Sequence, residues 1–237
     1  MEQTVNNLVC RLQCTKTSES LLVLQGLQAL ARVNPLDVGN YSIQALFDFL
    51  KKENVTPDDM QEFQETFQET LDLICRLVNS RDSEASLSNT KIVLGSEGTR
   101  NVELLLNLLE NKDMTIGIMA SQILTELHRK AGPELEVIIQ DCQDGMLKLL
   151  RRLPDASREE VRNQCISLVQ QLTASNEDMR DIVAFNEGFD ILFSIIAGEG
   201  GAADAGYVIQ DCLRICCNIL KESETRQRLF FEMDSGW

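Results

Sequence analysis

The chain has 237 residues, of which 43% are hydrophobic and 25% are charged, and its formal net charge is −15. This composition is typical of a globular protein with enough apolar surface for a core. The acidic balance disfavours nucleic-acid binding by phosphate neutralisation and adhesion to anionic lipid by charge alone. It suits basic protein partners, or simply a well-solvated surface.

The N-terminal stretch from Met1 to Gln13 has no basic segment followed by an apolar one, so no secretory signal is predicted there. No window reaches the roughly 18 uninterrupted apolar residues of a membrane span. The eight cysteines form no regular framework, and most lie in apolar helical stretches. Together these features predict a reducing, cytosolic setting.

A helical pattern returns about every 45 residues along the chain. Its helices are expected at residues 20–33, 67–78, 114–128, 158–172 and 207–221. One apolar position near the end of each helix marks the repeat, at spacings of 44, 50, 45 and 47 residues: Val33, Leu77, Leu127, Leu172 and Ile219. These spacings are typical of armadillo-type repeats, which bury a continuous core only when stacked and leave long open surfaces for other proteins.

Shorter helices are expected between the repeated ones, at residues 101–110, 144–153 and 187–197. Gly145 and Gly188 suit the tight turns into two of them. Residues 79–100 are predicted to be a long loop between repeats, and residues 198–206 a flexible connector. The predicted fold is all-α: a right-handed armadillo-type superhelix, or α-solenoid, of about five repeats that forms one domain over residues 1–237.

The sequence offers little for catalysis or metal binding. His128 is the sole histidine, which excludes most Ser–His and Cys–His machinery. It falls at a predicted helix end, where capping or surface exposure is expected. The pairs Cys10/Cys14 and Cys212/Cys216 have i,i+4 spacing, but there is no CxxC pair. Because phosphate-binding loop motifs are also missing, we expect no catalytic residues, no cofactor and no metal.

The last helix of each armadillo repeat lines a concave groove, where importin-like members clamp a peptide with Trp and Asn one turn apart. Five residue pairs take that position here: Gln28/Arg32, Asp72/Arg76, Gln122/Glu126, Ser167/Gln171 and Arg214/Asn218. Only Asn218 keeps the residue type, and no Trp occurs among them, which disfavours a nuclear-import receptor. The predicted protein-binding residues are the last three pairs, Gln122, Glu126, Ser167, Gln171, Arg214 and Asn218. The alternative is that they form a solvated helix face.

Several short motifs carry a resemblance to a known family. They are NVELLLNLLE from Asn101, REEVRN from Arg158, IVAF from Ile182 with the following Gly188 and Phe189, IIAGEGG from Ile195, and VIQDCLRICCNILKESETRQRLFFE from Val208. In this order and spacing the chain resembles the armadillo head of the general vesicular transport factor family, the golgin-type tethers of early Golgi traffic. The resemblance covers residues 101–232 well and is weaker before them.

The resemblance implies a homodimeric tether that docks vesicles in ER-to-Golgi and intra-Golgi transport before SNARE-mediated fusion. It implies a Rab-type small GTPase and SNARE or other tethering components as partners. It also implies a cytoplasmic protein, peripheral on Golgi and ER–Golgi intermediate membranes through its protein partners. The net charge, as stated above, predicts that no nucleic acid is bound. Family members continue through further repeats, a coiled coil and an acidic tail, so we expect this chain to be truncated relative to the family head. The alternative function is an armadillo co-chaperone that promotes nucleotide exchange on Hsp70, which the size favours and the motifs disfavour.

Overall fold

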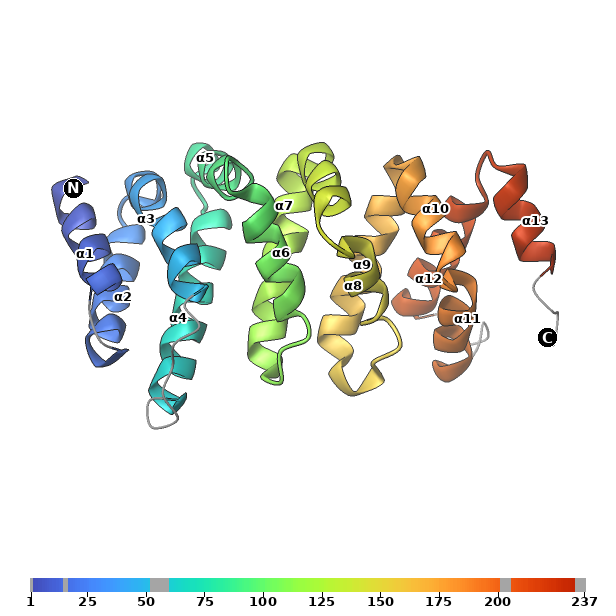
Figure 1. Cartoon of the computed structure of the whole chain (residues 1–237), viewed down its shortest axis with the longest axis horizontal. Helices are drawn as coiled ribbons and strands as arrows, with labels where there is room; N and C mark the ends of the chain where they lie inside the picture. The colour runs from blue at the N-terminus through green and yellow to red at the C-terminus, as the bar shows by residue number, and fades with distance from the viewer. Residues whose placement is uncertain (1, 15–16, 52–59, 201–205, 233–237) are drawn as a thin grey trace. The chain divides into compact units, whose positions relative to one another are not determined.

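The computed structural model describes residues 2–14, 17–51, 60–200 and 206–232, and within these ranges it contains helices and connecting turns but no β-strand (Figure 1). The all-α prediction is therefore confirmed. The chain divides into two compact units, residues 1–138 and 139–237, called here the N-terminal and the C-terminal unit.

The N-terminal unit contains six helices and most of a seventh, among the residues described: α1 (Glu2–Cys14), α2 (Thr17–Ala31), α3 (Pro35–Leu50), α4 (Met60–Val78), α5 (Ser83–Val93), α6 (Gly98–Leu108) and α7 (Met114–Asp141). Helix α3 packs against α1 and α5, whereas α2 packs against α4 (Figure 1). Leu24, Leu27 and Ile74 lie fully buried in the resulting core.

Helix α7 is bent at Ala131, whose φ of −146° and ψ of 53° are not helical, two residues before Pro133. Across the bend, His128 Nε2 lies 3.5 Å from Glu136 Oε1, and the two side chains are only 12% and 11% exposed. The predicted position near a helix end is correct, because the regular helix breaks off at Ala131, three residues after His128. The predicted surface exposure is wrong, because the second helical segment brings Glu136 against the His128 side chain and covers it.

The C-terminal unit begins with the end of α7 and contains, in its described residues, α8 (Gly145–Leu150), a 3-10 turn (Ala156–Arg158), α9 (Glu159–Ser175), α10 (Glu177–Phe185), α11 (Gly188–Gly198), α12 (Tyr207–Leu220) and α13 (Glu224–Glu232). Helices α9 and α12 pack side by side. They coincide with two of the predicted repeated helices. The apolar side chains at helical spacing along α9 are buried: Val161, Cys165, Leu168, Val169 and Leu172.

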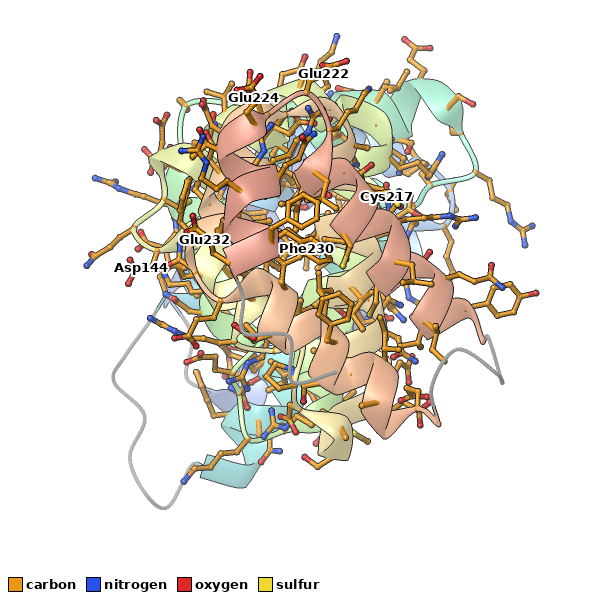
Figure 2. The ribbon with its side chains drawn as sticks, turned by 90° about the vertical axis from the view of Figure 1, so that its right-hand side faces the viewer. Asp144, Cys217, Glu222, Glu224, Phe230 and Glu232 are labelled. Carbon is orange, nitrogen blue, oxygen red and sulfur yellow. The ribbon has the colours of Figure 1, made fainter. Side chains whose placement is uncertain are left out.

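Helix α13 covers one side of this unit through an aromatic contact. Its Phe230 points from α13 toward α12 (Figure 2). The Phe230 ring lies 5.1 Å from that of Phe189 and 6.1 Å from that of Phe193, both on α11. The edge-on arrangement with Phe189 is one that aromatic pairs prefer. Phe230, near the end of the motif that starts at Val208, thus packs back onto its own unit. The neighbouring Phe231 does not, because it is 82% exposed.

The long loop predicted for residues 79–100 is wrong, because this stretch contains α5 and the start of α6. Asp82 caps α5 by accepting hydrogen bonds from the backbone of Glu84 at 3.0 Å and of Ala85 at 3.2 Å. The polar residues Ser86 and Thr90 are buried and donate their hydroxyl groups to backbone carbonyls. Low hydrophobicity therefore did not indicate a loop, since these small polar groups satisfy their hydrogen bonds within the helix packing.

The start of the predicted 198–206 connector matches the end of α11 at Gly198, whereas residues 201–205 lie outside the described residues. The repeat marker Val33 is wrong, because α2 ends at Ala31 and Val33 is 76% exposed. The core of α2 is instead formed by Leu24 and Leu27. The single-domain organisation, the repeat number and the handedness of the superhelix stay predictions.

Gly145 and Gly188 do open their helices, but for a different reason from the one predicted. The left-handed backbone is taken by the preceding residues, Asp144 with φ of 56° and Glu187 with φ of 59°. A Cβ on either glycine would lie 2.3 Å from a backbone oxygen, that of Ile139 or that of Val183. The glycines therefore permit the close approach of two backbone segments.

Candidate protein-binding surface

The predicted binding residues of the N-terminal unit, Gln122 and Glu126, lie half-buried on α7. Glu126 forms an ion pair with Arg129 at 2.7 Å and another with Lys130 at 3.3 Å. Burial alone would raise the pKa of the Glu126 carboxyl, but hydrogen bonds from these two cations outweigh it and lower that pKa. Glu126 is therefore ionised and already neutralised within its own helix.

The other four predicted residues lie on the packed helices α9 and α12 of the C-terminal unit. Gln171 Nε2 donates to Ser167, to its carbonyl at 3.2 Å and its hydroxyl at 3.3 Å. Arg214 is exposed and forms a 3.1 Å ion pair with Asp211. Asn218 is half-buried and donates hydrogen bonds from α12 to α9. Arg214 is therefore the most accessible of the four. That these residues bind a partner stays a prediction.

Two of the buried arginines, Arg180 and Arg226, make matching contacts that the sequence analysis did not predict. Arg180 on α10 donates to the carbonyls of Thr173 at 2.7 Å and Ala174 at 2.9 Å. Arg226 on α13 donates to the carbonyls of Ile219 at 2.6 Å and Lys221 at 2.9 Å. Each satisfies the carbonyl end of the preceding repeated helix.

A signal for these arginines was present in the repeat itself. Arg180 and Arg226 are 46 residues apart, and each follows a polar turn residue, Asn176 or Ser223, that caps the next helix. Comparing positions just after the repeated helix, rather than only its apolar stripe, would have found them. Their role is structural, because nearly all of each side chain is buried.

A pocket of about 700 Å³ opens where α2 and α4 end in the N-terminal unit. It is called here the basic pocket. Its charged lining consists of three arginines, Arg32, Arg76 and Arg81, and one acid, Asp82. Ala31, Val33 and Pro35 add apolar surface. The repeat alignment had already singled out Arg32 and Arg76 as groove positions, whereas Arg81 was assigned to the predicted loop.

The arginines of the basic pocket differ in whether a neighbouring carboxylate fixes their guanidinium group. Arg76 Nε lies 2.5 Å from Asp72 Oδ2, and Gln28 donates to the same carboxylate oxygen at 3.4 Å. Within the residues that the structure describes, Arg32 and Arg81 form no ion pair. Both are exposed. The pocket thus combines one fixed guanidinium with two that are open to solvent.

Cys75 also lines the basic pocket. Burial raises the pKa of its thiol, partly offset by a hydrogen bond from Asn79, and the nearby Asp72 raises it further. A raised pKa keeps the thiol protonated near neutral pH and makes it a poor nucleophile.

Across the described residues, no group of three His, Cys, Asp or Glu side chains is placed to hold a metal ion. No helix in the same part of the chain is long and apolar enough to cross a membrane.

The packed helix layers define a protein of the helical-repeat class. A crystal structure of Uso1 has the same fold, with a TM-score of 0.77 at 24% identity over 98% of this chain and 38% of that one. A second Uso1 crystal structure also has a TM-score of 0.77, at 22% identity. No family model matches the chain.

The curated relatives identify the family more specifically than the solved structures do, because their sequence identity is higher. Human general vesicular transport factor p115 is 31% identical over 235 aligned residues, which cover 92% of this chain and 24% of the human protein. Golgin candidate 6 of Arabidopsis thaliana is 30% identical over 198 residues, 82% of this chain and 21% of that protein. The chain is therefore homologous to the general vesicular transport factors, and the resemblance found in its motifs is confirmed. It spans about a quarter of the length of the curated relatives it matches.

Proposed function

We propose that this chain is a non-catalytic protein-binding scaffold of a vesicle tether. It acts in ER-to-Golgi and intra-Golgi transport and docks vesicles before SNARE-mediated fusion. Its partners are a Rab-type small GTPase and SNARE or other tethering components, and it reaches Golgi and ER–Golgi intermediate membranes from the cytoplasm through them. A homodimer is part of this proposal.

The observation that carries the proposal is the homology to general vesicular transport factor p115, which runs through the helices of both units and covers 92% of the chain. Stacked helical repeats leave long surfaces that suit protein partners. The protonated Cys75 thiol and the enclosed His128 are consistent with a binding role.

The alternative, a co-chaperone that promotes nucleotide exchange on Hsp70, has less support. Human p115, described above, is named for vesicular transport rather than for chaperone action. Stopped-flow release of labelled nucleotide from Hsp70 separates the two functions. Faster release with the purified chain would favour the co-chaperone.

The proposal is tested by capture of partners on the immobilised chain from cytosol and from Golgi membranes. We expect early-Golgi Rab GTPases and tethering components to be retained. A direct assay with purified Rab proteins in both nucleotide states follows, and the absence of binding in either state would contradict the tether role.

The predicted surface is tested in the same assay with a variant altered at Gln122, Gln171 and Arg214. Because these side chains are half-buried or exposed, alanine substitutions should leave the fold intact. Loss of capture in this variant alone would assign the partner to these residues, whereas unchanged capture would move the contact elsewhere.

A further inference from the structure

We propose that the basic pocket binds an acidic, extended segment of a partner protein, with the carboxylates of the segment on Arg32 and Arg81 and an apolar side chain against Val33. This inference rests on the protein-binding part of the proposed function and names the chemistry of one partner. It assigns the contact to the N-terminal unit and to residues outside the six predicted from the repeat.

The charge of the basic pocket is opposite to that of the chain. The formal net charge is −15, yet three arginines line this one pocket. Asp82, which caps α5 through two backbone hydrogen bonds of 3.0 and 3.2 Å, brings one negative charge to the lining. Because three arginines face this single acid, positive charge remains for a ligand.

The geometry of the arginines suits carboxylates. A guanidinium presents a rigid fork of donors that can bind a carboxylate through two parallel hydrogen bonds. Arg76 lies in the last turn of α4, where it also interacts favourably with the helix dipole, and Asp72 holds it in place. Arg32 and Arg81 lie beyond the ends of α2 and α4, so their exposed guanidiniums are the ones available to a partner.

The pocket is not only polar. Val33 is 76% exposed and lines it together with Ala31 and Pro35. A single exposed apolar residue is ordinary on a protein surface, but this one shares a concave site with the arginines. A segment that carries an apolar residue among acidic ones would match both parts of the lining.

The size and the surrounding charge favour a peptide over a lipid surface. A volume of about 700 Å³ lies in the range of clefts that hold a side chain and its neighbours rather than one small ion. A plane of anionic headgroups would also face other parts of a chain whose formal net charge is −15, whereas a narrow segment touches only the lining. Because charges are screened beyond roughly 8 Å at physiological salt, the local arginines dominate for a segment in the pocket.

The test measures fluorescence anisotropy of a dye-labelled ten-residue peptide of Asp and Glu with one central Leu, titrated with the full chain. We expect saturable binding that weakens as salt is added. Arg32→Glu and Arg81→Glu should each weaken it about tenfold, because reversal places like charges together. The matched control Arg228→Glu changes another exposed arginine, on α13 outside the pocket, and should alter affinity less than about twofold.

Val33→Ser tests the apolar contact. It should weaken binding of the Leu peptide and leave a peptide with Gly in place of Leu unchanged. Thermal unfolding of each variant should match the wild type, because all the altered side chains are exposed. Equal weakening by Arg228→Glu would overturn the inference. Tighter saturable binding of inorganic phosphate or of phosphatidylserine vesicles than of the peptide would also overturn it.

Membrane recruitment of the wild-type chain distinguishes this inference from the proposed function. Recruitment to Golgi membranes without peptide binding at the arginines would overturn the inference and leave the tether role standing. Peptide binding at the arginines without recruitment would contradict the tether role and support an acidic-segment site.

Discussion

Asn218 on α12 donates a hydrogen bond of 3.1 Å to the carbonyl oxygen of Gln170 on α9, and a second of 3.2 Å to the hydroxyl of Thr173. Asn218 is the one candidate residue that matches the asparagine with which importin-like repeats clamp a peptide. Here its side chain instead joins two neighbouring repeated helices. In the N-terminal unit, Gln28 on α2 joins α4 in a comparable way through Glu69, at 2.6 Å. Part of the polar face predicted to bind partners therefore stabilises the stacking.

Asn218→Ala removes both hydrogen bonds between α9 and α12. We expect it to lower the free energy of unfolding by about 1 to 2 kcal/mol, since it leaves a carbonyl and a hydroxyl without this donor. Urea denaturation monitored by circular dichroism measures the change. Arg214→Ala, one turn earlier on the same helix, removes only an exposed ion pair and should cost under about 1 kcal/mol. Equal losses in the two variants would contradict the role assigned to Asn218.

Arg226→Met should destabilise the C-terminal unit by about 2 to 3 kcal/mol, because the carbonyls of Ile219 and Lys221 lose a charged donor. Arg180→Met should cost a similar amount at the preceding repeat junction. Urea midpoints of the two variants measure both effects. Lysine at either position should not restore stability, since it lacks the two-pronged geometry. Full rescue by lysine would show that charge alone matters.

Gly188→Ala should destabilise the chain by about 1 to 3 kcal/mol, because its Cβ would lie 2.3 Å from the Val183 carbonyl oxygen. Glu187→Gly serves as the opposite control. Glu187 has a φ of 59°, so glycine there should be neutral or stabilise by up to about 1 kcal/mol. Thermal unfolding compares the two. Tolerance of alanine at Gly188 would mean that the turn can shift at little cost.

Stability should fall at alkaline pH through the buried cysteines. Burial raises the pKa of Cys165, Cys212 and Cys216 to about 12, from 9.0 for the unperturbed thiol. The raised values stabilise the folded state fully below about pH 9, and this contribution is lost as pH rises from about 9 toward 12. Urea titrations across this range measure the loss, and a flat profile would contradict it.

Alkylation offers an independent measurement on the same cysteines. Brief treatment with iodoacetamide near neutral pH should label Cys10 and Cys217, which are exposed, while Cys165, Cys212 and Cys216 stay protected until the chain unfolds. Mass spectrometry locates the labels. Rapid labelling of Cys165 in the folded chain would show that its helix opens readily.

The helical class and most of the repeated helices were predictable from the sequence. Apolar residues that recur at helical spacing mark the face of a helix that is buried. Leu77, Leu127, Leu172 and Ile219 are all fully buried, as the repeat indicated. The prediction failed where burial involves polar groups. Ser86 and Thr90 look like loop residues, yet they lie inside α5 because their hydroxyls bond to backbone carbonyls.

The candidate binding residues divide in the same way. The sequence by itself determined which positions share one face of each repeated helix, since helical spacing sets the face on which a side chain lies. Only the tertiary structure decided that Asn218 is used between α9 and α12, and that Arg81 joins Arg32 and Arg76 in one pocket. Those outcomes depend on distances between segments tens of residues apart, which local periodicity does not contain.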